Sequence, residues 1–403
     1  MKNKIAIYTL TSELHDEQAV SSVTREFLSS LGIEYDFMGN DYASYGTHVL
    51  DLIYVRTGGT EGIFRRLLPQ LQAQSAKPFY LLTSGKSNSL AASMEILSYL
   101  RQNGIRGEIV HGAAEYITKK ISLLQTVSEA RLLLSQCRLG IIGQPSDWLI
   151  SSHADKAEVK RRLGIELVDI PMQELLETIG GATTTGVGPA AVDGALRIYD
   201  ALKTIVQRHH LQGFTLRCFD LLTAVHNTGC LALAKLNSEG LQTGESTSGM
   251  DFVAGCEGDV PALLSMTIAK VLTGVSGFQA NPSTIDPLTG QVLFAHCTIP
   301  LNMVERYELD THYESGIGVG IRGYMRPGEV SVFKVSGDLS RYFIDEAQLI
   351  GNQSEPDLCR TQQMIRLSSP AVASYFLTNP IGNHHVIVPG HHRELIEELL
   401  KND

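Results

Sequence analysis

The sequence predicts an α/β fold with two doubly wound parallel-sheet domains followed by a small antiparallel β domain. Strand-like apolar runs alternate with helix-like runs, and this alternation starts afresh after residue 137. Alternation of this kind is typical of βαβ units in a parallel sheet. Beyond residue 300 the helix-like runs give way to β-forming residues and glycine turns, which favours an antiparallel sheet or barrel. We therefore expect domains at residues 1–137, 138–300 and 301–403.

Length and composition indicate a globular protein with several domains. At 403 residues the chain is too long for one hydrophobic core, and 43% apolar residues with 19% charged residues are ordinary for a soluble protein. The net charge is −10 and no block of Lys or Arg occurs, so neither nucleic acid nor an anionic membrane is expected as a partner. No run reaches the roughly 18 apolar residues of a membrane span, and the first apolar run is too short for a signal peptide. We expect a cytoplasmic protein whose cysteines, which form no Cys-x-x-Cys pair, are reduced.

The first domain is expected to open as strand, helix, strand and to continue in the same order. Residues 56–61 follow a strand and precede a helix, and the exposed amides of such a turn can hold an anion or a sugar hydroxyl. They lack the spacing of a Walker loop or of a dinucleotide-binding turn, so a plain tight turn is the favoured interpretation. Strands are expected at residues 4–10, 33–39, 51–59 and 78–85, and helices at 17–32, 61–74 and 87–104.

The second domain repeats this order and carries two candidate substrate-binding residues. Trp148, the only tryptophan, follows the first strand, where it could flank a ligand or pack as a partly buried side chain. Arg217 lies near the end of a later strand, expected at residues 214–222, and could reach a polyol or pair with a surface partner. Residues 138–150 are expected to be a strand that runs into a turn at residues 145–148. Another strand is expected at residues 165–171, and helices at 154–164, 172–180 and 195–213.

Residues 254–300 are the stretch around which we expect the functional site. Glu257 precedes an apolar helix-like run whose start is marked by Asp259 and Pro261, and helix-terminal amides favour negative charge. The run VLFAHC has the pattern of a short buried strand that ends at His296. An acid and an imidazole therefore both lie at element ends, where α/β folds assemble their sites. A charged helix start and an ordinary buried histidine explain the same residues equally well.

Near the end of the chain, a strand, a turn and a terminal helix are expected in NPIGNHHVIVPGHHRELIEELL. Asn383 and His384 lie between a glycine and an apolar strand, where side chains can be aimed into a cleft. His391 and His392 open the terminal helix. Although a histidine gains nothing from the dipole there, an exposed capping region is the default assignment for this pair.

Five stretches in this order resemble the L-fucose and L-arabinose isomerase superfamily, and in particular its shorter, fucose-isomerase-like branch. They are GCEGDVPALLSM, LTGVSGFQANPSTID, VLFAHC, HYESGIGVGIRG and GNHHVIV. The resemblance runs from about residue 215 to the end of the chain and is weaker in the α/β segments before it. Five ordered motifs over nearly half of the chain are a specific signal.

The resemblance implies an aldose–ketose isomerase, an intramolecular oxidoreductase that acts on a small-molecule sugar with a divalent metal ion, usually Mn²⁺. In that family the open-chain sugar chelates the metal through O1 and O2, and acids move a proton between C1 and C2 through a cis-enediol. Glu257 matches the acid that is both metal ligand and acid–base group, His384 the metal-binding histidine, and Asn383 its substrate-contacting neighbour. A further histidine ligand of the arabinose branch lies where His296 stands. The family pattern also implies a homo-oligomer, a trimer or hexamer, in which subunits complete each other's sites.

One position departs from the family pattern. The second family acid falls at Asn281, 24 residues beyond Glu257. Because an asparagine carbonyl can ligate a metal, Asn281 stays a candidate metal-ligating and catalytic residue, but it cannot accept a proton at neutral pH. Asp286 could supply the base instead, although an Asp before a proline is typical of a turn. The departure leaves three functions open: a sugar isomerase, which is favoured, another carbohydrate enzyme such as an epimerase or lyase, and a sugar-binding protein without catalysis.

Overall fold

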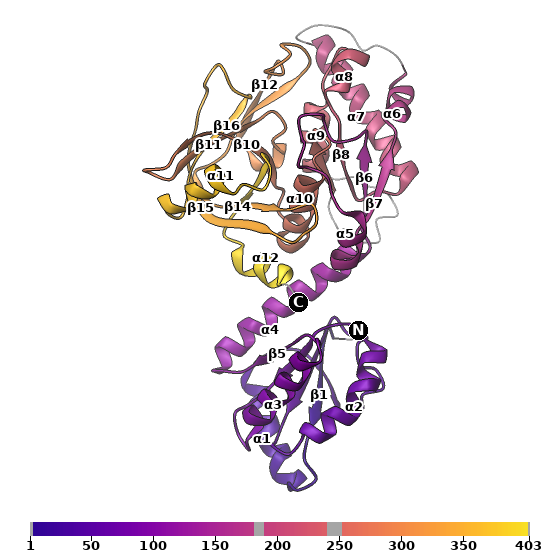
Figure 1. Ribbon diagram of the computed structural model, residues 1–403, viewed down its shortest axis with the longest axis vertical. Coiled ribbons are helices and arrows are strands. Elements are labelled where there is room, and N and C mark those ends of the chain that lie inside the picture. Colours follow the sequence, from indigo (N-terminus) through magenta and orange to yellow (C-terminus); the bar gives the residue numbers. More distant parts are fainter. Residues whose placement is uncertain (1–2, 181–188, 240–251, 402–403) are drawn as a thin grey trace. The chain divides into compact units, whose positions relative to one another are not determined.

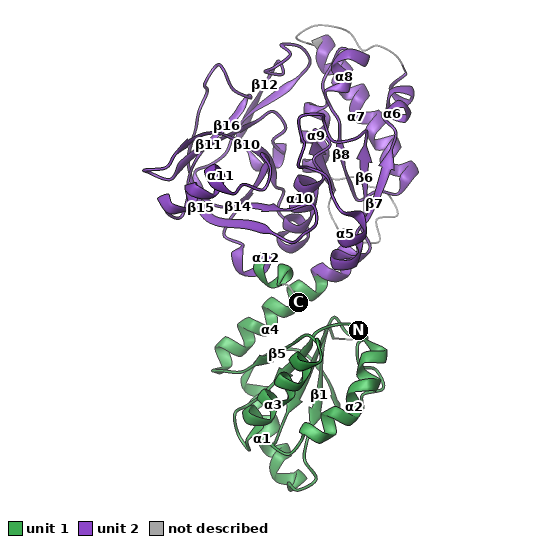
Figure 2. Ribbon diagram, viewed as in Figure 1, with its two compact units in different colours: residues 1–129, 397–403 green, residues 130–396 purple. Residues whose placement is uncertain are grey.

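The computed structural model describes residues 3–180, 189–239 and 252–401 and confirms the expected fold class (Figure 1). The chain divides into two compact units, residues 1–129 with 397–403 and residues 130–396 (Figure 2). The division into three domains at residues 137 and 300 stays a prediction. Within the described residues, no helix combines the length and apolar character that crossing a membrane requires.

The first unit is built around a five-stranded parallel sheet with strand order β2-β1-β3-β4-β5. Alternate residues of its first strand face opposite sides: Ala6 and Tyr8 pack with the second and third helices, and Ile5 and Ile7 with the first and fourth. Both faces are therefore covered, as in a doubly wound fold. The strands are β1 (Ile5–Leu10), β2 (Asp36–Gly39), β3 (Leu50–Val55), β4 (Phe79–Leu82) and β5 (Gly107–Val110), and the helices are α1 (Glu17–Ser30), α2 (Glu61–Gln74), α3 (Ser89–Gln102) and α4 (Ala114–Ser135), which runs on into the second unit.

The second unit begins with a four-stranded parallel sheet of order β7-β6-β8-β9. Its strands are β6 (Arg138–Ile142), β7 (Glu166–Ile170), β8 (Gly213–Leu216) and β9 (Val253–Cys256). The helices of this layer are α5 (Lys156–Leu163), α6 (Met172–Ile179), α7 (Pro189–His209), α8 (Asp220–Ala224), α9 (Cys230–Glu239) and α10 (Val260–Thr273). The expectation of a strand over residues 214–222 was wrong beyond Leu216, because Arg217 turns out of the sheet to pair with Asp147 and Asp220, and residues 220–224 form α8.

The rest of the second unit is a closed antiparallel barrel with strand order β10-β11-β16-β15-β14-β17. The barrel strands are β10 (Phe278–Asp286), β11 (Gln291–His296), β14 (Gly328–Val335), β15 (Tyr342–Asn352), β16 (Thr361–Arg366) and β17 (His385–Pro389). A separate hairpin consists of β12 (Arg306–Asp310) and β13 (Gly320–Tyr324), and short helices are η1 (Leu301–Met303), η2 (Pro370–Val372), α11 (Ala373–Thr378) and α12 (Arg393–Leu400). Phe278, Phe294 and Val332 are fully buried members of the barrel's apolar core. The barrel thus begins with strands that precede residue 301.

Helix α10 lies between the parallel sheet and the barrel of the second unit (Figure 1). Nearly all of its residues are buried, including Ser265, Thr267 and Lys270. A mainly apolar helix that is buried on every side is a core helix. Asp259 caps its first turn by accepting a hydrogen bond from the amide of Ala262 at 2.7 Å. The residues just before α10 therefore lie where the sheet and the barrel meet.

Candidate metal centre

Glu257 occupies the turn between β9 and α10, at the carboxyl end of a parallel strand, where ligand sites of α/β sheets lie. Its backbone has φ 60°, and the next residue, Gly258, has φ 72°. The turn is held from two sides: the Gly258 amide donates to the Leu216 carbonyl at 3.0 Å, and the Glu257 carbonyl accepts from the Ser146 amide at 2.9 Å. Two consecutive positive φ angles send the Glu257 side chain away from the strand direction.

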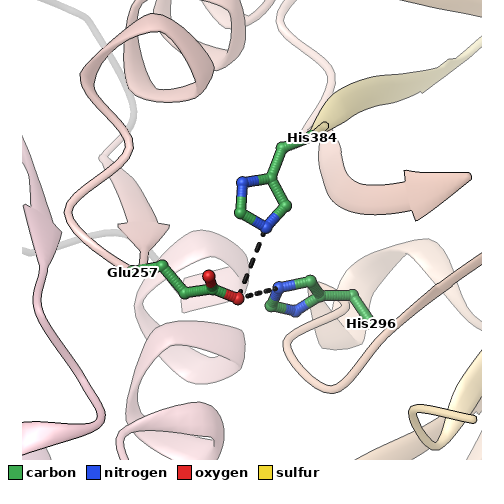
Figure 3. A group of neighbouring side chains, drawn as sticks. All are labelled: Glu257, His296 and His384. Carbon is green, nitrogen blue, oxygen red and sulfur yellow. Dashed lines mark ion pairs between the residues drawn. The ribbon is translucent and has the colours of Figure 1, made fainter. Parts of the chain in front are cut away.

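Two histidines from the barrel meet this carboxylate (Figure 3). His296 is the last residue of β11, and His384 immediately precedes β17. The Nε2 atoms of both imidazoles lie 3.4 Å from Oε1 of Glu257. All three side chains are buried, and their donor atoms lie within 4.8 Å of one another. The structure thus brings together three of the four metal-ligating residues named from the sequence.

Each imidazole is oriented by a hydrogen bond at its other nitrogen. Nδ1 of His384 lies 2.8 Å from Oδ2 of Asp259, and Nδ1 of His296 lies 3.0 Å from Oγ1 of Thr298. The ammonium of Lys334, on β14, lies 3.2 and 3.3 Å from the two oxygens of Asp259, and both groups are fully enclosed. Outer contacts of this type fix ring orientation and leave Nε2 free for a metal.

Trp148 fixes the remaining oxygen of Glu257. Its indole Nε1 donates to Oε2 at 2.8 Å, while the residue as a whole is 53% exposed. The indole meets the ring of Phe219 edge-on at 4.7 Å. The predicted substrate-binding residue Trp148 is therefore at the centre, where it also orients the Glu257 carboxylate.

Charge holds the buried groups in defined protonation states. Burial opposes ionisation of Glu257, but the imidazoles of His384 and His296 outweigh it and hold the pKa of Glu257 well below its ordinary value. Burial would lower the pKa of His384, but the carboxylates of Glu257 and Asp259 raise that pKa to about 9. The pKa of Asp259 falls to about 2, because Lys334 and His384 outweigh the effect of its burial.

The residues fit a divalent cation. Nε2 of His384 is buried and has no hydrogen-bond partner among the described residues, and an unpaired buried polar atom is costly unless something else satisfies it. At metal–ligand distances of about 2.1 Å, the donors around one ion lie roughly 3 to 4 Å apart. The 3.4 Å separations between the imidazole nitrogens and Oε1 are of that size. One carboxylate and two imidazoles suit Mn²⁺ and its neighbours and leave coordination positions for a substrate.

Asn281 lies on β10, between the barrel strands that carry the two histidines. Two residues earlier, the amide of Gln279 bonds the backbone N–H and C=O of Cys256, at 2.9 and 3.2 Å. Because side chains alternate along a strand, half-buried Asn281 shares the face of β10 that points toward Cys256 and Glu257. Its roles as metal ligand and catalytic residue stay predictions.

The other two predicted substrate-binding residues have defined surroundings. Asn383 is exposed, and its carbonyl lies 3.1 Å from Nδ1 of His385. The guanidinium of Arg217 binds Asp147, Asp220 and the carbonyl of Pro145, which secures the turn that leads into Trp148. Asp286 accepts hydrogen bonds from Leu288 and Thr289, as expected of a turn residue.

Two titratable residues near the centre in electrostatic terms were not predicted from the sequence. His312 and Glu314 lie in the connection between β12 and β13, within the stretch HYESGIGVGIRG. Burial and the His296 imidazole lower the pKa of His312 to about 4. Partial burial and repulsion by Glu257 raise the pKa of Glu314. The only sequence signal for them was that stretch of family resemblance, which named no side chain.

The first unit holds a cavity of about 900 Å³ at the carboxyl ends of its central strands β1 and β3. Arg56, from the turn whose amides could hold an anion or a sugar hydroxyl, lines it and is paired with Glu17 at 2.9 Å. Among the residues that the structure describes, the group of metal-type ligands is Glu257, His296 and His384, which belong to the second unit and do not line this cavity.

Comparisons with known proteins point in the same direction. No model of a known protein family matches the chain. The chain is 23% identical over 273 residues to the sulfoquinovose isomerases of Priestia aryabhattai and Priestia megaterium, and 24% identical over 274 residues to that of Clostridium sp.. Each match covers 62% of this chain and 59% of the relative, so the chain spans about three fifths of the length of these curated relatives. The similarity to sugar isomerases is distant.

Proposed function

We propose that this chain is an aldose–ketose isomerase that uses a divalent metal ion, Mn²⁺ or a close neighbour. The observation that carries this proposal is the convergence of two imidazole Nε2 atoms on one carboxylate oxygen in a buried place, with 3.4 Å between each nitrogen and Oε1 of Glu257. The distant similarity to proteins named sulfoquinovose isomerase supports the same reaction class. A pure binding protein has no need of three buried metal-type ligands.

Glu257, His296 and His384 would hold the ion, and Asn281 is the fourth candidate ligand. When bound, the ion supplies Lewis acidity, which polarises a carbonyl group of the sugar. Trp148 keeps the Glu257 carboxylate in one orientation through its 2.8 Å hydrogen bond, and the half-exposed indole offers an apolar face to a sugar ring or chain. Asp259 holds the ring of His384 in place. Asn383 and Arg217 stay proposed substrate contacts.

The substrate that we propose is a monosaccharide in its open-chain aldose form. The names of the relatives make sulfoquinovose the first sugar to try. L-Fucose, L-arabinose and D-arabinose are the neutral alternatives that follow from the family resemblance. The homo-oligomer stays a prediction. A single species of monomer mass in light scattering would contradict it.

The test measures metal content and conversion of these four aldoses, with and without Mn²⁺, in the wild-type chain and in Glu257→Gln. We expect metal-dependent conversion of at least one sugar in the wild type. In Glu257→Gln, kcat should fall at least about 100-fold and metal affinity should drop, because a positioned carboxylate contributes roughly 10²- to 10⁴-fold to proton transfer and this one is also a ligand. Glu329→Gln, at an exposed position of β14, is the matched control and should behave as wild type. A protein that binds no metal and converts none of the four sugars would overturn the proposal.

A further inference from the structure

The first unit contains a cavity that the proposed reaction does not use. The cavity measures about 900 Å³, and every residue that lines it belongs to this unit. It lies at the carboxyl ends of β1 and β3, which are neighbours in the parallel sheet. The helix after β1 packs on one face of the sheet and the helix after β3 on the other, so the cavity lies at a topological switch point. Open α/β sheets bind their ligands at such points.

Arg56 places a buried positive charge at this edge of the sheet. It directly follows β3, and its backbone amide donates to the Leu10 carbonyl at 2.9 Å. The guanidinium is fixed by two hydroxyl groups: Nε donates to Oγ1 of Thr24 at 2.8 Å, and Nη1 donates to Oγ1 of Thr11 at 3.1 Å. A buried guanidinium needs a counter-charge, and its planar fork of donors matches an oxyanion.

Glu17 supplies that counter-charge from the surface. Its Oε1 accepts three hydrogen bonds, from Nη1 and Nη2 of Arg56 at 3.0 and 2.9 Å and from the Ser21 hydroxyl at 2.8 Å. The two partners differ in exposure, because the Arg56 side chain is 7% exposed and the Glu17 side chain 67%. A carboxylate that stays largely in water gains little from its ion pair, so a dissolved anion can replace it. Oε1 therefore marks an oxyanion position that is defined by three donors.

The charges that line the cavity favour an anion. Three arginines, Arg25, Arg56 and Arg66, and two glutamates, Glu13 and Glu17, lie around it. Arg25, Arg66 and Glu13 form no ion pair or side-chain hydrogen bond within the described part of the chain. The lining thus has one positive charge in excess, although the whole chain has a net charge of −10. A local positive potential of this kind concentrates small anions.

The cavity also has an apolar side and a fixed floor. The apolar residues that line it include Leu28, Tyr35, Phe37, Ile63 and Leu67. Phe37 is 54% exposed, so its ring can cover the body of a ligand. The turns after β1 and β3 are tied together, because the amide of Ser12 donates to Oγ1 of Thr57 at 3.0 Å. An apolar wall beside an oxyanion position, in a volume within the range of small-molecule sites, fits an organic anion better than a bare ion.

We propose that this cavity binds a small organic acid whose carboxylate takes the place of the Glu17 carboxylate on Arg56. The ligand oxygen accepts the hydrogen bonds from Arg56 and Ser21, and Glu17 turns into the solvent. Arg56 therefore keeps a partner in both states, and Glu17 acts as an internal competitor of the ligand. This site is separate from the metal centre and does not depend on the proposed isomerase activity.

The experiment is a calorimetric titration of the full chain with malonate and, separately, with inorganic phosphate, at constant ionic strength in chloride. It compares the wild type with Glu17→Gln and Arg56→Lys. We expect malonate to bind Glu17→Gln at least about tenfold more tightly than the wild type, because the internal competitor is gone. We expect Arg56→Lys to bind malonate at least about tenfold more weakly than the wild type, because an ammonium lacks the fork of donors.

Two matched variants control for the loss of charge and for the change of side chain. Glu26→Gln removes an exposed carboxylate from the same helix as Glu17, and Arg65→Lys changes an exposed arginine; neither residue lines the cavity. Both variants should bind malonate as the wild type does. Urea unfolding of Glu17→Gln decides the question if Arg56→Lys does not fold. Malonate should raise the unfolding midpoint of Glu17→Gln more than that of the wild type, because the bound anion stabilises the folded state.

The proposal is overturned if Glu17→Gln binds malonate no more tightly than the wild type, or if Arg56→Lys binds it equally well. Tighter binding of phosphate alone to Glu17→Gln would replace the carboxylate by a phosphoryl group. If neither anion binds any of the chains, the pair of Arg56 and Glu17 is structural only. Metal content and sugar conversion are not read in this experiment, so its failure is distinct from a failure of the proposed function.

Discussion

Glu257 is held from three directions by side chains that are remote in sequence. Trp148 fixes one carboxylate oxygen, and His296 and His384 converge on the other. Against the effect of burial, the charges of this carboxylate and of Asp259 raise the pKa of His384 to about 9, so that imidazole carries a proton at neutral pH until a metal replaces it. Proton and metal therefore compete for the same nitrogen.

This competition predicts that Mn²⁺ binding at pH 7 releases about one proton. With a pKa of about 9, His384 is almost fully protonated at pH 7, whereas a ligating imidazole must be neutral. Below that pKa, metal affinity should accordingly increase about tenfold for each unit by which the pH is raised. Titration calorimetry in two buffers that differ in ionisation enthalpy measures the proton count. The control variant His391→Ala, which changes a histidine outside the cluster, should also release about one proton. Release of almost no proton by the wild type would contradict the competition between proton and metal at His384.

Residues of the site were predictable where an acid or a histidine stood at the end of a predicted helix or strand. Glu257 before a helix, His296 at the end of an apolar strand and His384 before another are such positions, and the structure brings these three together. Gln279 and Lys334 gave no signal, because a glutamine or lysine within a strand pattern is ordinary until its buried partner is known. Glu314 was marked only by the stretch of family resemblance, because the Glu257 charge that raises its pKa lies 57 positions away in the chain.

At the scale of elements, the turn between β9 and α10 sets the direction of Glu257. Gly258 has φ 72°, and a Cβ placed on it would lie 2.6 Å from the carbonyl oxygen of Gln144 and 2.8 Å from Cα of Pro145. Those atoms are backbone and cannot move aside like the end of a side chain. Gly274, which ends α10 with φ 70°, has nothing within 4 Å of the same position.

The two glycines make a matched pair of alanine substitutions. Gly274→Ala should cost about 1 to 2 kcal/mol of unfolding free energy, which is the price of a left-handed conformation for a residue with a Cβ. Gly258→Ala should cost more, because the clash with Gln144 adds to the same strain, and it should also weaken Mn²⁺ binding by displacing Glu257. Urea unfolding and metal titration measure both effects. Equal stabilities of the two variants, or unchanged metal affinity of Gly258→Ala, would contradict this account of the turn.

The local sequence pattern predicted whether a segment is a helix or a strand better than it predicted where the segment ends. Cap residues made α10 predictable, since Asp259 and Pro261 open it and Gly274 closes it. The strand expected over residues 214–222 was too long, because an ion pair between Arg217 and Asp147 takes the chain out of the sheet. Asp147 is remote from residues 214–222 in the sequence, so no local pattern identifies it as the partner of Arg217.

At the scale of the whole molecule, the order of layers was readable but the closure of the barrel was not. Two rounds of alternating strands and helices predicted the two parallel sheets. The replacement of helix-like runs by β-forming residues and glycine turns after residue 300 predicted the antiparallel part. The barrel closes because β17 pairs with both β10 and β14, and the first of these pairings joins residues more than a hundred positions apart. That pairing also carries His384 to Glu257, so the site depends on it.

The buried charges of the second unit predict how the stability of the metal-free protein changes with pH. The pKa of His384 is raised from 6.5 to about 9 in the folded chain, so its contribution to stability is fully present below pH 6.5 and is lost as pH rises through 9. Between pH 6.5 and 8.5 the loss is on the order of 2 kcal/mol. With saturating Mn²⁺ the same histidine must be neutral, so stability should not fall over this range.

Urea unfolding of the wild type and of His384→Gln, each at pH 6.5 and 8.5 without metal, isolates this term. Other groups titrate in the same window, among them Cys297, whose pKa is lowered to about 6 mainly by a hydrogen bond from Cys359, but they are common to both chains. The difference in slope between the two chains therefore belongs to His384. If metal-free wild type loses no more stability than His384→Gln as pH rises, the imidazole is not held protonated by Glu257 and Asp259, and the competition between proton and metal does not exist.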